Sequence, residues 1–166
     1  VDRFMMKVLV DYPTDEEEYV IVERVTGPAV QVQAVATTDQ LAALQALCRQ
    51  VFVDPALVQY AVRLVSATRT PEKHGLKDTA RFITYGASPR ATIGLVEGAR
   101  ALAMLRGRNY ALPEDMSDLV PDVLRHRIVL SYEGLSEGLD SDALIARIMD
   151  AVTPPAKPLE HDKKAA

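Results

Sequence analysis

The sequence has few of the features that mark secreted or membrane proteins. Its 166 residues include a single cysteine, Cys48, so no disulfide can form within the chain. No apolar run approaches the roughly 20 residues needed to cross a membrane, and no signal peptide is visible. We therefore expect no membrane span, and a cytoplasmic location fits the cysteine usage.

The chain also lacks an excess of positive charge. It has 19 Lys and Arg against 23 Asp and Glu, for a net charge of −4. Nucleic-acid binders usually carry a basic patch and a high pI, so we expect no nucleic-acid partner. His74 has no cysteine, histidine or acidic cluster at ligand spacing beside it, and we expect no metal site.

Helical patterns with clear start signals account for most of what is present. Thr14 and Thr37 each begin a capping box, with Glu17 and Gln40 three residues later, and Asp54 precedes a proline at a first helical position. We predict helices after each of these three caps and at residues 88–106, 113–120, 121–127 and 140–152. Both faces of the helix after Asp54 look apolar enough to be buried.

The remaining segments are short or irregular. Residues 5–10 (MMKVLV) and 128–130 (IVL) are brief apolar runs, and the first is predicted to be a buried strand. Residues 30–36 fit either a short strand or an extended loop. Residues 70–80 form the clearest exposed loop, and residues 153–166, with three prolines and several charges, are predicted to be a disordered tail.

The most informative stretch is residues 85–91 (YGASPRA). Ser88 is a good N-cap and a proline follows at the first helical position, so Arg90 falls in the first turn. A cation there is unfavourable against the helix dipole unless an anion lies nearby. Because helix N-termini bind phosphate groups, a phosphate-bearing ligand would explain Arg90. The alternative is a structural ion pair with a carboxylate from another helix.

The helix after Ser88 is apolar over a wide surface, which predicts a central helix packed on most sides. Gly94 and Gly98 each cost roughly 1 kcal/mol of helix propensity relative to alanine. We expect them to permit the close approach of another backbone.

The string GASPRA at residues 86–91, with GRNY at 107–110 and LRHR at 124–127, resembles the C-terminal part of MoxR-family AAA+ ATPases. The resemblance runs from Val1 to about Val152. It implies a mainly α fold, a helical-bundle lid domain of AAA+ type with a few short strands. On this basis residues 1–12 would be the end of the ATPase core, including its last strand, residues 13–152 the lid, and residues 153–166 the tail.

The resemblance also implies roles for particular residues. Arg90, capped by Ser88, matches the sensor 2 arginine that contacts the γ-phosphate of ATP, bound with Mg²⁺ in the full-length protein. Arg3, within Asp2-Arg3-Phe4, matches a candidate arginine finger that acts on a neighbouring subunit. The implied partners are the chain's own ATPase core, neighbouring subunits of a homo-oligomeric ring, and a client protein complex that is remodelled or activated in a chaperone-like way.

The chain itself has no P-loop of the form G-x-x-x-x-G-K-[ST] and no strand ending in paired acids, so it lacks Walker A and Walker B. It also begins at Val1 without an initiator methionine. We therefore expect a C-terminal fragment that neither holds nor hydrolyses ATP alone.

Two other functions remain open. A non-catalytic helical interaction (adaptor) module fits the wide apolar helices. A helix-turn-helix DNA binder could use Pro121–Arg127, although the acidic balance disfavours it. The basic residues 125–127 would otherwise complement the dipole at a helix C-terminus.

Overall fold

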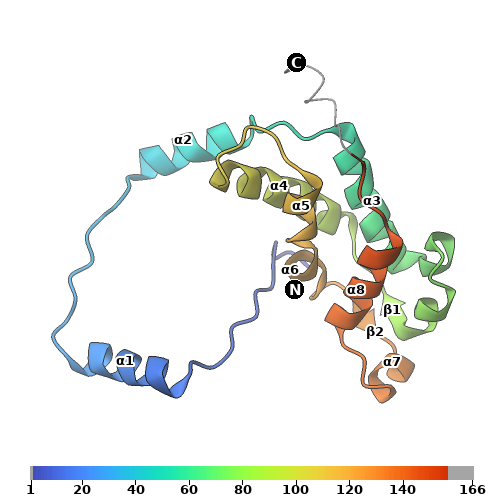
Figure 1. Cartoon of the computed structure of the whole chain (residues 1–166), viewed down its shortest axis with the longest axis horizontal. Coiled ribbons are helices and arrows are strands. Elements are labelled where there is room, and N and C mark those ends of the chain that lie inside the picture. Colours follow the sequence, from blue (N-terminus) through green and yellow to red (C-terminus); the bar gives the residue numbers. More distant parts are fainter. Residues whose placement is uncertain (1, 157–166) are drawn as a thin grey trace.

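A computed structural model describes residues 2–156 of the chain. The fold is mainly helical, as predicted. In chain order (Figure 1) the elements are α1 (Asp15–Thr26), α2 (Thr38–Cys48), α3 (Pro55–Arg69), the 3₁₀ turns η1 (Pro71–His74) and η2 (Lys77–Phe82), β1 (Ile83–Tyr85), α4 (Pro89–Leu105), α5 (Pro113–Ser117), α6 (Val120–Leu124), β2 (Val129–Leu130), α7 (Tyr132–Ser136) and α8 (Ser141–Ala151).

Side-chain caps start the helices where the sequence predicts them. In α1 the Glu17 amide donates to Thr14 Oγ1 at 3.3 Å, and the Thr14 amide donates to the Glu17 carboxylate at 2.9 Å. The Thr37 box of α2 forms in the same way, and Asp54 accepts from the backbone at the start of α3. These caps satisfy amides that the first helical turn leaves without an intrahelical partner.

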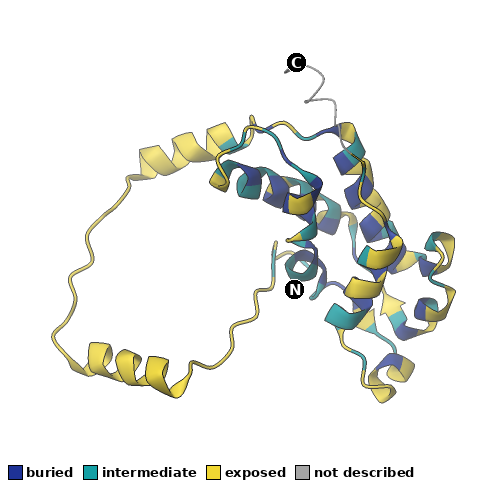
Figure 2. Cartoon of the chain, in the orientation of Figure 1, coloured by how far each residue is buried: buried dark blue, intermediate teal, exposed yellow. Residues whose placement is uncertain are grey.

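The hydrophobic core lies between α3 and α4, with α5, α6 and α8 packed around them. Its members start at Val51 and end at Val152, and Leu57, Leu64 and Leu95 are completely buried. Figure 2 shows this burial confined to one side of the molecule. The core is thus assembled by the part of the chain that follows α2.

A small antiparallel sheet closes the bundle near α7. β1 pairs with β2, with Ile83 opposite Leu130 and Tyr85 opposite Val129. The short apolar run at residues 128–130 therefore contains the strand β2. Gly134 lies in α7, where an added Cβ would come 3.1 Å from the Phe82 carbonyl oxygen.

Residues 8–47, which we call the arm, stand away from the bundle. Figure 1 shows α1 joined to the rest of the molecule by two long connections, and every residue of the arm is exposed. Residues 30–36 form an extended loop, which settles the alternative left open by the sequence. Apolar side chains such as Ile21 (48% exposed) and Leu44 (48%) face solvent.

The prediction of a buried strand at residues 5–10 is wrong. This segment has no strand, and Val8, Leu9 and Val10 are exposed. No strand of the described residues lies alongside it, so its backbone groups find other partners. The Lys7 amide donates to the Asp122 carbonyl at 2.8 Å.

Two further expectations need correction. The second face of α3 is only partly buried, because Val65 is fully buried but Val58 is 37% and Val62 48% exposed. The predicted loop at residues 70–80 contains η1 and η2, and His74 Nε2 lies 3.4 Å from Ser66 Oγ rather than free in solvent. The predicted tail falls mostly on residues 157–166, which lie outside the described part of the chain.

Helix α4 is packed on most sides, as predicted, although Leu105 at its C-terminal end is 84% exposed. At Gly98 an added Cβ would lie 2.9 Å from Leu119 Cδ1, and at Gly94 it would lie 3.5 Å from Val123 Cγ1. The glycines admit mainly the side chains of neighbouring segments, not a second backbone as expected.

Candidate functional site

The start of α4 is fixed by the end of α3. The Ala87 amide donates to Thr68 Oγ1 at 2.8 Å, and Arg69 Nη1 donates to the Ala87 carbonyl at 2.7 Å. At Gly86 the backbone comes so close that a Cβ would lie 2.3 Å from the Thr68 carbonyl oxygen. The segment before Ser88 therefore has one path across α3, which only glycine at position 86 allows.

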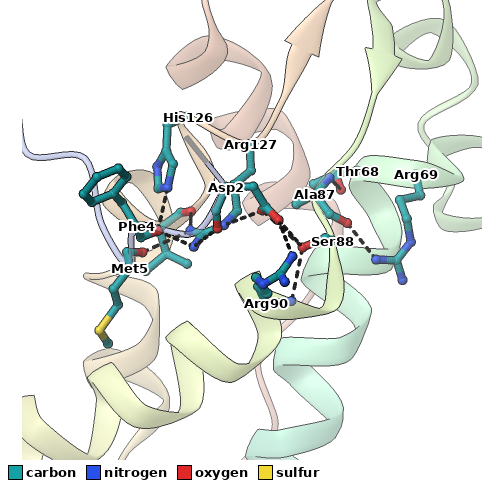
Figure 3. Close-up of polar contacts among 11 residues, drawn as sticks. Asp2, Phe4, Met5, Thr68, Arg69, Ala87, Ser88, Arg90, His126 and Arg127 are labelled. Carbon is teal, nitrogen blue, oxygen red and sulfur yellow. Dashed lines mark hydrogen bonds and ion pairs between the residues drawn. The ribbon is translucent and has the colours of Figure 1, made fainter.

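Ser88 caps α4 as predicted, with the Arg90 amide donating to Ser88 Oγ at 3.2 Å. The same hydroxyl donates to the carboxylate of Asp2, at 3.0 and 3.1 Å from its two oxygens. Figure 3 shows Asp2 lying over the helix start, between Arg90 and Arg127. An anionic group thus already occupies the position where the helix dipole favours negative charge.

Asp2 is held by two guanidinium groups as well. Arg90 Nη1 lies 3.2 Å from Asp2 Oδ2, and Arg127 Nε lies 3.1 Å from Asp2 Oδ1. Burial raises the pKa of Asp2, but hydrogen bonds from Ser88, Arg90 and Arg127 outweigh it and keep the pKa below its ordinary value. The carboxylate is therefore stabilised in its charged form at neutral pH.

Arg90 has an ion-pair partner but is not enclosed by the bundle. Its side chain is 60% exposed. Arg90 and Arg3 line one pocket of about 200 Å³, together with Glu97, Gly94 and Arg127. The structure thus brings both predicted site arginines, Arg3 and Arg90, to one open surface next to the Ser88 cap.

Sequence analysis missed the role of residues 125–127, which we call the basic clamp. The Arg127 side chain is 2% exposed and donates to main-chain oxygens of residues 2–5. His126 Nε2 lies 3.0 Å from the Phe4 carbonyl, and Arg125 Nη1 donates to the Lys7 carbonyl at 2.6 Å. Arg127 is buried and all three side chains bind backbone carbonyls, so they do not form an exposed basic patch. Arg127 also donates to the Val123 carbonyl in the last turn of α6, which fits the expected role of bases at a helix C-terminus.

A second charged cluster lies at the other end of α4. The fully buried carboxylate of Asp115 accepts from Arg106 at 2.9 Å, from Arg108 at 2.5 and 2.7 Å, and from the Leu112 amide at 2.8 Å. Burial raises the pKa of Asp115, but the bonds from Arg108, Leu112 and Arg106 hold it below the usual range. This cluster fixes the turn between α4 and α5.

Within residues 2–156, no group of three or more His, Cys, Asp or Glu side chains is arranged to hold a metal ion. The described helices include none that is long and apolar enough to cross a bilayer. Both findings concern the described residues alone.

Comparisons with known proteins agree with this geometry. Residues 75–148 match the AAA lid domain family. The chain is 42% identical to Chaperone MoxR1 of Mycobacterium tuberculosis over 93% of its own length and 41% of that protein. It is 35% identical to Protein MoxR of Paracoccus denitrificans, over 90% of this chain and 47% of the relative.

A solved structure shows the same fold. The crystal structure of a "putative ATPase" from Cytophaga hutchinsonii superposes with a TM-score of 0.88 at 36% identity, covering 93% of this chain and 48% of that one. The chain therefore spans less than half the length of each of these relatives. Coverage of 93% includes most of the arm.

Proposed function

Because the chain belongs to the MoxR family of AAA+ proteins and residues 75–148 match the AAA lid domain family, we propose that it is the lid portion of a ring-forming ATPase. The ATPase would couple hydrolysis of Mg²⁺-bound ATP to chaperone-like remodelling or activation of a client protein complex. The observation that carries this proposal is the exposed guanidinium of Arg90 at the capped start of α4, in one pocket with Arg3.

Arg90 is suited to act as the sensor 2 residue. A γ-phosphate brought to the start of α4 would meet a cation, a serine cap and the positive end of the helix dipole. Phosphate would then compete with the Asp2 carboxylate for Arg90. A charge-assisted hydrogen bond of this kind contributes roughly 1.5–3 kcal/mol, and it is lost when hydrolysis releases the phosphate, so the lid can move. The geometry fits phosphate from the same subunit or from a neighbour.

The ATPase core is the proposed partner of the arm. A segment with no buried residue lacks the packing contacts that would hold it in one conformation. A solved chain about twice as long nevertheless has a closely similar structure over 93% of this one. Exposed apolar groups on α1 and α2, such as Ile21 and Leu44, are what a covered helix face would present. The rest of such a chain would supply the covering surface.

The same arm is the observation that favours a second function, a helical adaptor module without a nucleotide role. Its exposed apolar helices could bind another protein whether or not ATP is present. In that case the Arg90–Asp2 ion pair would be purely structural. The two functions differ in whether Arg90 affects ATP turnover.

Replacement of Arg90 tests the proposal. In the full-length protein we expect Arg90→Ala to lower kcat for ATP hydrolysis about 10- to 100-fold, as expected for loss of one charge-assisted bond to phosphate. Circular dichroism should show an unchanged helical content. Arg81→Ala is the matched control, because Arg81 is also exposed and paired with acids, Glu133 at 2.7 Å and Glu137 at 3.4 Å. Unchanged turnover in the Arg90 variant would favour the adaptor module.

A further inference from the structure

We propose that Arg127 is a positioning residue that fixes the segment carrying Arg3 to the lid, so that Arg3 and Arg90 move as one unit. This inference rests on the proposed function, in which Arg3 reaches the nucleotide of a neighbouring subunit. It assigns the basic clamp a part in coupling one nucleotide site to the next.

The contacts of Arg127 lie on both sides of Arg3. Its Nη2 donates to the Asp2 carbonyl at 3.2 Å and to the Phe4 carbonyl at 2.6 Å, and its Nη1 donates to the Met5 carbonyl at 3.0 Å. One guanidinium therefore holds the residue before Arg3 and the two after it, as Figure 3 shows. This leaves the Arg3 side chain exposed, at the pocket that it shares with Arg90.

Arg127 is itself anchored in the lid. Its side chain is 2% exposed, and Nη1 also donates to the carbonyl of Val123, a buried residue of α6. A buried guanidinium that satisfies several carbonyls at fixed angles uses the planar fork of donors that only arginine has. A lysine at this position could not reach the same set of oxygens.

The neighbouring clamp residues continue the attachment along the chain. His126 shares the Phe4 carbonyl, Arg125 binds the Lys7 carbonyl, and the Lys7 amide donates to Asp122. From Lys7 to Leu47 every residue is exposed. The clamp therefore supplies most of the hydrogen bonds that hold the backbone of residues 2–7 to the lid, and these bonds end where the exposed arm begins.

Asp2 connects the clamp to Arg90. Its carboxylate contacts Arg127, Ser88 and Arg90 at the same time. A phosphate that draws Arg90 away from Asp2 would alter a contact one residue from Arg3. The two arginines are thus linked through a chain of direct hydrogen bonds.

A double-mutant cycle in the full-length protein separates positioning from general stabilisation. We expect Arg3→Ala to lower kcat about 1,000-fold, the lower end of the effect of an arginine finger. Arg127→Gln should lower kcat about 100-fold, as a displacement of roughly 1 Å can, with KM for ATP nearly unchanged. In the Arg3→Ala background, Arg127→Gln should have a much smaller effect, because only its link to Arg90 through Asp2 remains to be disturbed. Arg81→Gln serves as the control and should leave kcat unaltered in both backgrounds.

The possible results distinguish the two proposals. If Arg3→Ala leaves kcat unchanged, the finger role within the proposed function fails. If Arg3→Ala lowers kcat but Arg127→Gln either has no effect or lowers it by the same factor in both backgrounds, the positioning role of Arg127 is overturned and the proposed function stands.

Hydrogen exchange provides a readout that does not depend on activity. In Arg127→Gln we expect the Lys7 amide to exchange at least about 10-fold faster while the amides of α4 keep their protection. If all of α4 also exchanges faster, the substitution has unfolded the lid, and His126→Ala takes its place because it removes one contact to Phe4 and leaves Arg127. A smaller loss of kcat, absent in the Arg3→Ala background, would support positioning, and an equal loss in both backgrounds would contradict it.

Discussion

The arm and the bundle of residues 51–152, called the lid below, contain similar apolar side chains but use them differently. In the lid, Leu57, Leu64 and Leu95 are completely buried, whereas in the arm the leucines of α2 are about half exposed. Both regions form capped helices, so local signals do not distinguish them. The difference shows that the lid is stabilised by contacts among the described residues, whereas the described residues do not cover the apolar side chains of the arm.

The largest expected effect comes from equal truncations in the two regions. Leu64→Ala removes a fully buried side chain and should lower the free energy of unfolding by about 3 kcal/mol. Leu44→Ala, at a half-exposed site in α2, should cost less than about 0.5 kcal/mol. Urea denaturation of the 166-residue chain measures both values.

The informative quantity is the difference between the two losses of unfolding free energy. A cost for Leu44→Ala close to that for Leu64→Ala would mean that the arm folds back onto the lid in solution. The arm and the lid would then unfold as one cooperative unit.

Much of the fold could be predicted because helix starts are local. The caps at Thr14, Thr37 and Asp54 and the apolar spacing that follows them depend on residues within one or two turns. What the sequence could not show is which apolar faces have a partner. The run at residues 5–10 looks like a buried strand, but strand formation requires a neighbouring strand, and the described residues place none beside it.

The candidate site also has one part that the sequence indicates and one part that it does not. Ser88 and Arg90 could be predicted because the cap and the arginine are two residues apart and their positions in the helix are visible in the sequence. The pairing of Arg127 with residues 2–5 joins positions more than 120 apart, which no local pattern indicates. The one signal in the sequence is the cluster of three basic residues at 125–127. These side chains have more hydrogen-bond donors than the end of one short helix can use.

A smaller effect is expected from the charge of Asp115, which the lid buries. Asp115→Asn should lower the free energy of unfolding by about 2 kcal/mol, less than the 3–5 kcal/mol typical of a fully buried pair, because Arg106 and Arg108 keep some access to water. Asp118→Asn is the control, since Asp118 is 53% exposed and pairs with the same Arg106, and it should cost under about 0.5 kcal/mol.

The pH dependence follows from the same carboxylate. Because the pKa of Asp115 is lower in the folded state, its contribution is present above the unfolded-state value of about 3.9 and is lost as the pH falls through the folded-state pKa. Acid titration of the wild-type chain should therefore show stability falling below about pH 4, and more steeply than in Asp115→Asn. Equal slopes would mean that Asp115 is not held in its charged form.

The smallest effect on the 166-residue chain is expected in α1, and it should differ in the full-length protein. Ile21→Asp places a charge on an apolar group that is already 48% exposed, so the unfolding of the 166-residue chain should be unchanged within about 0.5 kcal/mol. In the full-length protein the same change should lower stability by more than about 1 kcal/mol, because a charge would be buried against the proposed core. Gln33→Asp, in the extended loop of the arm, is the control. If Ile21→Asp leaves the stability of both the 166-residue chain and the full-length protein unchanged, α1 is not covered by the ATPase core. Its apolar face would then bind a separate partner.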